Sequence, residues 1–200
     1  MQGTNVAVGE YLIIFAAILI GLAVADLSFS LHRLLRHGRS IQWHPIVPLV
    51  GFLVLCFILN LWWGLYRISQ VDEFSFIQFL PNVFMLLTLF LLAAAVFPDE
   101  KLEKGASLLE YYLDSRKQIW GLFSLYFVIV VINRILDGVA EGITLAQHFD
   151  LAMENVIGAL MCFGLMWTRS MIAHWAVVIF GLVITGISWS GATLQTAASG

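Results

Sequence analysis

Long apolar runs alternate with short polar stretches along the whole chain of 200 residues. Six of these runs have about the length that a helix needs to cross the roughly 30 Å hydrocarbon core of a bilayer. We predict the spans at about 11–31, 46–66, 81–97, 118–135, 151–167 and 171–189. The pattern therefore predicts an all-α polytopic membrane protein, with six transmembrane helices that form one domain over residues 1–200.

Proline and serine residues mark where some of the predicted helices begin. Pro45 and Pro81 are expected at the starts of the second and third spans, because the first turn of a helix does not need the N–H that proline lacks. Ser107 and Glu110 match a capping box, in which the serine hydroxyl accepts a bond from the backbone N–H three residues on. We therefore predict a cytoplasmic amphipathic helix that runs directly into the fourth span.

Small residues repeat every four positions in the first span, at Ala17, Gly21 and Ala25. This spacing lets the backbone of another helix approach closely in lipid, within one chain or between copies. It favours tight helix packing and a homo-oligomer. The alternative is that Ala and Gly are common in any membrane span.

The composition supports a membrane protein and argues against other classes. Hydrophobic residues make up 60% of the chain and charged residues 12%, about half the charged fraction of a soluble protein. The net charge of −3 offers no basic surface for nucleic acid, so the lipid bilayer is the expected surrounding. Cys56 and Cys162 lie within apolar runs and are interpreted as buried hydrophobes. The first run is expected to be a retained span and not a cleaved signal peptide.

Basic residues set the predicted orientation. Eight Lys and Arg residues fall in loops on one side of the six spans: Arg33, Arg36, Arg39, Lys101, Lys104, Arg116, Lys117 and Arg169. Only Arg67 and Arg134 fall on the other side. Because cytoplasmic loops carry the excess of positive charge, we place the basic side in the cytoplasm and both termini outside.

A polar stretch at residues 133–155 separates the fourth and fifth spans. The uncharged part of the fourth span, residues 119–132, is only about 21 Å long, so the polar residues beside it should lie within the outer part of the membrane. They are expected to line an outward-facing vestibule: Asn133, Arg134, Asp137, Glu141, Glu154 and Asn155, with Asn60 and Asn82 nearby. Arg134 and Asp137 have the spacing of a helical ion pair. The alternative is that these charges neutralise each other at the surface and have no further role.

Asp26 is an acid within the first span. Asp26, Ser30, Arg33 and His37 share one face of an extended first helix. An intramembrane carboxylate beside an arginine can tune an ion path or take up a proton, and it can equally lock two helices together.

The remaining polar residues predict no cofactor, metal or catalytic centre. His32, His37, His44 and His174 fall near the cytoplasmic face and are interpreted as solvated. The chain has no HExxH spacing and no Ser–His pair within one site that would indicate an enzyme. The centres of the spans offer little beyond three hydroxyls, at Thr88, Ser124 and Thr185. An intramembrane enzyme is therefore the least favoured class.

Two motifs carry a resemblance over roughly the first third of the chain. The sequence ADLSFSLHRLLR at residues 25–36 is followed by NLWWGLYR at residues 60–67. In these motifs the chain resembles a family of small bacterial inner-membrane proteins whose first helix ends in a similar way and whose second helix ends in tryptophans. The resemblance implies a bacterial inner membrane and no particular mechanism.

Two functions remain open from the residues alone. The first is an oligomeric ion channel or transporter with the outer polar residues at its mouth. The second is a non-enzymatic sensor or assembly subunit that docks a protein partner through the charged cytoplasmic residues 99–117. The clustered outer charges favour the first, which is the main prediction, and the scarcity of polar groups at the bilayer midplane favours the second, which is the alternative.

Overall fold

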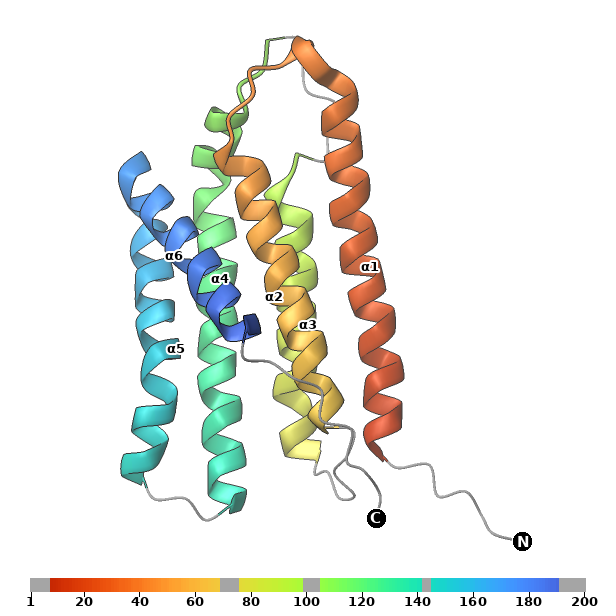
Figure 1. The fold of residues 1–200 in the computed structure, drawn as a ribbon, viewed down its shortest axis with the longest axis vertical. Coiled ribbons are helices and arrows are strands. Elements are labelled where there is room, and N and C mark those ends of the chain that lie inside the picture. The colour runs from red at the N-terminus through yellow and green to blue at the C-terminus, as the bar shows by residue number, and fades with distance from the viewer. Residues whose placement is uncertain (1–7, 69–75, 99–104, 142–144, 191–200) are drawn as a thin grey trace, which may run out of the picture.

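The computed structural model describes residues 8–68, 76–98, 105–141 and 145–190, and it is all-helical in these ranges (Figure 1). The helices are α1 (Val8–His37), α2 (Ile46–Ile68), α3 (Phe76–Val96), α4 (Leu108–Glu141), α5 (Leu145–Leu165) and α6 (Met171–Ser190), with a 3-10 turn, η1 (Gly38–Ser40), after α1. The predicted all-α class is confirmed for the described residues.

Five helices are long and apolar enough to cross a membrane, namely α1, α2, α3, α4 and α6. The helix α5 has 21 residues, about 31 Å, but its apolar part is the shorter segment Ala152–Leu165. The charged Glu154 lies within that part. These helices are compatible with a multi-pass membrane protein, and a sixth span at α5 stays a prediction.

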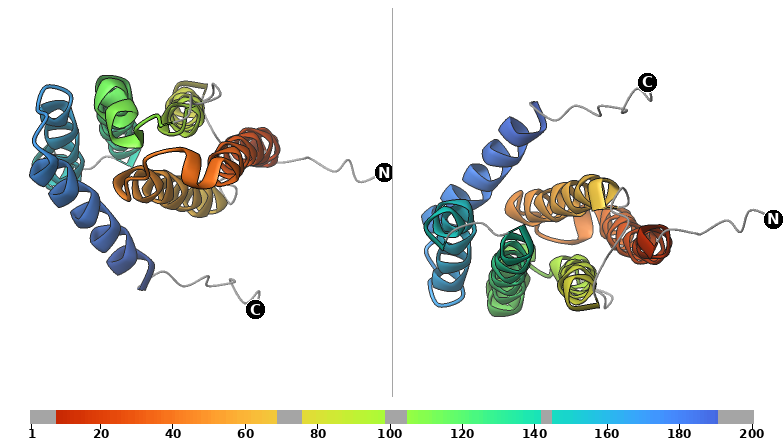
Figure 2. Two further views of the ribbon diagram at one scale, coloured as in Figure 1. Left: turned by 90° about the horizontal axis from the view of Figure 1, so that it is seen from above. Right: turned by 90° about the horizontal axis from the view of Figure 1, so that it is seen from below.

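Helices α1 to α5 run side by side along the long axis of the molecule, whereas α6 crosses them obliquely (Figure 1). Seen end-on, α5, α4, α3 and α1 follow one another in a row, and α2 packs on one side of that row (Figure 2). Helix α6 starts beside the end of α5, contacts α2 and leads away from the bundle (Figure 2). We call the end where α1, α3 and α5 finish the basic end, and the other the far end.

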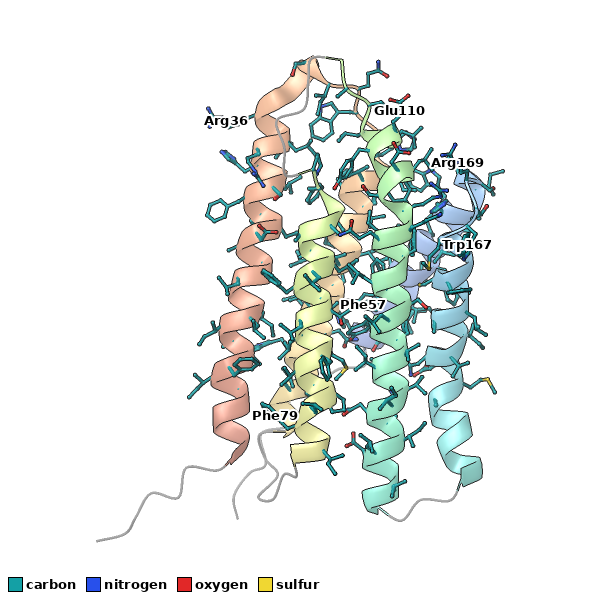
Figure 3. The ribbon with its side chains drawn as sticks, turned by 180° about the vertical axis from the view of Figure 1, so that it is seen from behind. Arg36, Phe57, Phe79, Glu110, Trp167 and Arg169 are labelled. Atoms are coloured by element: carbon teal, nitrogen blue, oxygen red, sulfur yellow. The ribbon has the colours of Figure 1, made fainter. Side chains whose placement is uncertain are left out.

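Aromatic rings fill the contact between α2 and α4. Phe57 of α2 meets three rings of α4, those of Phe123, Tyr126 and Phe127, with centroids 5.5, 5.5 and 5.6 Å away in edge-to-face geometry. This arrangement is favourable because the positive edge of one ring meets the negative face of another. Phe57 lies near the middle of the bundle (Figure 3), so this contact is closed at mid-height by tightly packed apolar groups.

A close helix approach places the end of α3 against α2. A Cβ atom added at Gly51 would lie 2.6 Å from the Phe97 ring, which is closer than atoms can pack. Gly64, on the same helix, has open space around it. The absence of a side chain at Gly51 is therefore what allows the Phe97 ring to sit on α2.

The position of Pro81 corrects the prediction for the third span. Helix α3 begins at Phe76, so Pro81 lies inside the helix and not at its start. Proline removes one backbone hydrogen bond, and membrane helices tolerate this loss because neighbouring groups satisfy the freed carbonyl. The apolar residues before Pro81 can then extend the helix at the far end.

Helix α4 begins at the predicted cap. The backbone N–H of Glu110 donates to the Ser107 hydroxyl over 3.3 Å, as the capping-box pattern indicates. From Leu108 the helix continues without a break for 34 residues, about 51 Å. It is longer than the hydrocarbon core, so part of it must extend beyond the bilayer if it spans one. The amphipathic role of its first turns stays a prediction.

Two loops are joined at the basic end. The N–H of Gln42 donates to the Ala106 carbonyl over 2.9 Å, and the N–H of Leu108 donates to the Gln42 carbonyl over 3.1 Å. The N–H of Gly105 donates to the Ser40 carbonyl over 2.7 Å. Gly105 has φ +89°, which is a conformation that glycine adopts without strain. The segment after α1 and the segment before α4 therefore form one hydrogen-bonded unit.

Candidate functional site

The predicted outer polar residues lie near the far end of the seam between α4 and α5. The Arg134 guanidinium lies 3.6 Å from a Glu154 carboxylate oxygen, with the side chains 44% and 73% exposed. The Asn133 amide donates to Asp137 over 3.3 Å. This ion pair joins the two helices, and the pair between Arg134 and Asp137 stays a prediction. An ion pair with this exposure contributes roughly 0–1 kcal/mol.

Two amide groups in this seam each have one atom without a partner among the described residues. The Asn133 Oδ1 and Asn155 Nδ2 atoms are buried and have no hydrogen bond among the described residues. One is an acceptor and the other a donor, and Asn155 is only 9% exposed. Asn82 is also buried, whereas Asn60 is exposed. The Glu141 side chain lies outside the described part of the structure.

Asp26 lies part-buried on α1, one turn before the buried Ser30. Its Oδ2 atom is buried without a hydrogen bond among the described residues. The Arg33 guanidinium donates to the Ser30 hydroxyl over 2.8 Å, so the predicted polar face of α1 is present as far as Arg33. The His37 side chain lies outside the described residues.

Two residues of the predicted small-residue repeat, Ala17 and Gly21, do not pack against another described helix, whereas Ala25 is half-buried. Gly21 has no atom within 4 Å of an added Cβ, and Ala17 is exposed. The face of α1 that packs on the bundle holds Ala23 and Leu27 instead. Close packing at Ala17, Gly21 and Ala25 against a second copy stays a prediction.

The prediction of a solvated His174 is wrong. His174 lies in the first turns of α6 and is fully buried, with 0% exposure. Its Nδ1 atom is 2.7 Å from the Tyr112 hydroxyl and its Nε2 atom is 3.2 Å from the Thr168 carbonyl. The Trp120 indole N–H donates to the same hydroxyl over 3.0 Å. We call these four groups the His174 network.

With a neutral imidazole, the chemistry of the four groups indicates where the protons lie. A carbonyl only accepts, so Nε2 of His174 carries the hydrogen that bonds to Thr168. An indole N–H only donates, so the Tyr112 hydroxyl accepts from Trp120 and donates its own hydrogen to Nδ1. Every polar atom then has a partner. This is the condition under which a buried polar network stabilises a structure.

The His174 network joins α4 to the start of α6. Tyr112 and Trp120 are eight residues apart on one face of α4, and the ring of His174 packs edge-on against Tyr112 at 5.3 Å. The buried residues of α6 are His174, Val178 and Thr185, whereas Ile172 is 83% exposed. The network is therefore the main polar attachment of α6 to the bundle.

The other histidines differ from one another. His32 is exposed, as predicted. His44 is part-buried: its Nδ1 accepts the N–H of Ile46 over 3.4 Å, and its ring lies 6.3 Å from that of Trp175. His44 thus helps to cap α2. In the described residues no three His, Cys, Asp or Glu side chains come close enough together to hold a metal ion.

The hydroxyls predicted at the centres of the spans bond to backbone carbonyls. Thr88 donates to Phe84 over 2.7 Å, Ser124 to Ala159 over 3.0 Å and Thr185 to Gly181 over 2.8 Å. These donors are thus already used within the bundle. These three hydroxyls therefore have no donor hydrogen free for a polar solute.

In its described residues the protein is all-helical, and its long apolar helices are compatible with a multi-pass membrane protein. No protein-family model, curated protein or solved structure matches the chain. Function must therefore be inferred from the arrangement of its own residues.

Proposed function

We propose that this protein is a non-enzymatic, membrane-embedded assembly or sensor subunit that binds a protein partner at its basic end. The packing at the centre of the bundle is the observation that carries the proposal, because aromatic rings fill the contact between α2 and α4 and the three central hydroxyls bond to backbone carbonyls. The basic end, in contrast, is held by backbone hydrogen bonds between two loops and by the His174 network.

The exposed charges at this end suit a protein partner. Glu110 and Asp114 are exposed on the first turns of α4, immediately after the joined loops. Side chains on such a rigid element lose little entropy when a partner binds. Charges of both signs on one helix also favour selection of a complementary surface. The membrane position predicted for this end is the cytoplasmic side of a bacterial inner membrane.

Site-specific photo-crosslinking in cells tests the proposal. A photoreactive residue at Glu110 should give one discrete crosslinked protein, and Asp114→Lys in the same chain should reduce that product at least fivefold. The matched control places the photoreactive residue at Ile77, which is exposed at the far end. Equal crosslinking from both positions, or no effect of Asp114→Lys, would refute a specific partner at the basic end.

Transport is the second candidate, and it is favoured by two buried atoms without a hydrogen bond among the described residues, Asn133 Oδ1 and Asn155 Nδ2. A path for ions would run along the α4–α5 seam or between copies, with these groups exchanging hydrogen bonds with the solute. Liposomes that contain the purified chain should then show selective ion flux that Asp137→Asn or Glu154→Gln alters. Absence of flux for potassium, sodium, chloride and protons in folded protein excludes this candidate.

A further inference from the structure

Three cations gather where α4 meets the turn between α5 and α6. Arg116 and Lys117 are consecutive on α4, and Arg169 lies in the turn. The Lys117 ammonium sits 4.9 Å from the centre of the exposed Trp167 ring, which is two residues before Arg169. Figure 3 shows Trp167 and Arg169 together at the basic end. We call the four residues the basic corner.

No carboxylate neutralises the basic corner in the part of the chain that the structure describes. The ion pair between Arg134 and Glu154 lies near the far end and not at the basic corner. A terminal nitrogen of Arg116 donates to the Leu113 carbonyl, but its Nε atom is buried without an acceptor. A buried charged donor with no partner is unfavourable. Among the described residues, the basic corner therefore lacks an acceptor for this Nε–H.

The position of the basic corner along α4 indicates which acceptor it meets. From Gln118 to Asn133 the helix carries no Lys, Arg, Asp or Glu, and these residues extend over about 24 Å. If this uncharged stretch crosses the hydrocarbon core, Arg116 and Lys117 lie at the level of the lipid headgroups. Trp167 beside them has the interfacial position that tryptophan prefers. The anions at this level are lipid phosphates.

We propose that the basic corner binds the phosphate of an anionic phospholipid headgroup. Arginine and lysine are the residues that bind phosphate oxygens, arginine through several N–H groups at once. The Lys117 and Arg169 side chains are exposed and can close on the phosphate, while the part-buried Arg116 adds positive charge beside them. Basic pockets of this kind between membrane helices bind anionic headgroups.

A bound headgroup would act on α6. It would bridge α4 and the turn from which α6 starts, directly beside the His174 network, because Arg116 lies within electrostatic range of the His174 ring. The lipid would thus hold the first turn of α6 against α4 from outside, and the network holds it from inside. This binding site does not depend on the protein partner proposed above.

Native mass spectrometry of the full-length chain in detergent tests the proposal. The probes are phosphatidylglycerol, which is anionic, and phosphatidylcholine, which is zwitterionic. The variant Lys117→Gln/Arg169→Gln removes two exposed cations and leaves the part-buried Arg116 in place. The control variant Arg33→Gln/Arg36→Gln removes two exposed cations of α1 at the same end. Thermal unfolding of each variant first establishes that it is folded.

The expected result is specific in lipid and in position. Phosphatidylglycerol should bind at least tenfold more tightly than phosphatidylcholine. The Lys117→Gln/Arg169→Gln variant should bind it about 30-fold more weakly, at about 1 kcal/mol for each basic residue, and the α1 control should change affinity less than threefold. Equal binding of the two lipids, or equal losses in the two variants, would overturn the proposal. If millimolar inorganic phosphate displaced phosphatidylglycerol, the basic corner would be a site for free phosphate. That result would also overturn the proposal that the anion comes from a lipid.

Discussion

The substitution Tyr112→Phe removes one hydroxyl from the centre of the His174 network and leaves the ring in place. Two buried groups then lose their partner, namely the Trp120 indole N–H, 3.0 Å from the hydroxyl, and Nδ1 of His174, 2.7 Å from it. A hydrogen bond contributes about 1 kcal/mol net in proteins and about 0.6 kcal/mol on average between membrane helices. Loss of both bonds should therefore lower the free energy of unfolding by about 1–2 kcal/mol.

The control is Tyr126→Phe on the same helix. Tyr126 is buried among aromatic rings, and no hydrogen bond of its hydroxyl is recorded among the described residues. The same loss of one oxygen should therefore cost less than about 0.5 kcal/mol. Both variants are compared with wild type by unfolding in mixed micelles of mild detergent and sodium dodecyl sulfate, followed by tryptophan fluorescence.

A double-mutant cycle separates the network from local packing. Once His174 is replaced by Leu, the Tyr112 hydroxyl no longer has the imidazole as acceptor, so Tyr112→Phe should cost less in that background. We expect a coupling energy of about 1 kcal/mol between the two positions. If Tyr112→Phe is no more destabilising than Tyr126→Phe, or if the coupling is zero, the proposed proton arrangement is wrong.

Three further substitutions test other contacts by the same unfolding assay. Gly51→Ala brings a methyl group into the Phe97 ring and should cost about 1–3 kcal/mol, whereas Gly64→Ala in open space should be neutral or stabilising; a harmless Gly51→Ala would contradict the close approach. Ser107→Ala removes the cap of α4 and should cost about 1 kcal/mol, and no loss would mean that water replaces the cap. Glu154→Gln breaks an exposed ion pair and should cost less than about 1 kcal/mol, so a larger loss would show that the pair is buried in the membrane.

Much of the helical architecture could be predicted because it depends on local composition. Uncharged runs of about 20 residues in lipid have few alternatives to the helix, since every backbone group must find a partner within its own segment. The cap at Ser107 could be predicted for the same reason, as it involves residues only three apart. Pro81 misled the prediction because a membrane helix can continue past a proline whose lost bond is near its end.

The His174 network could not be predicted because it depends on which helices become neighbours. His174 follows the turn that contains Arg169, and such a position suggests solvent as long as the helix beside it is unknown. A signal was nevertheless present on α4, where Tyr112, Arg116 and Trp120 recur every four residues with polar atoms on one face. Polar atoms in a row on one face of an apolar helix need hydrogen-bond partners. Such a row therefore predicts a polar partner on another helix, although not its identity.

The His174 network and the proposed lipid at the basic corner both hold the start of α6. A last prediction therefore concerns local opening of this helix. If Tyr112→Phe weakens the attachment of α6 by about 1.4 kcal/mol, hydrogen exchange of the backbone amides of residues 174–185 should become about tenfold faster. Phosphatidylglycerol at 100 times its Kd should slow this exchange about 100-fold, because a ligand that binds only the attached state suppresses opening by 1 + [L]/Kd.

The same lipid concentration should slow exchange only about fourfold when Lys117→Gln/Arg169→Gln is added to Tyr112→Phe, because the affinity is then about 30-fold lower. The amides of α2 serve as an internal control, since they lie outside the attachment of α6 and should exchange equally in all variants. Equal protection of α6 by the lipid with and without Lys117 and Arg169 would show that the lipid acts on the whole bundle. In that case the basic corner has no separate role in holding α6, and the His174 network alone would account for its attachment.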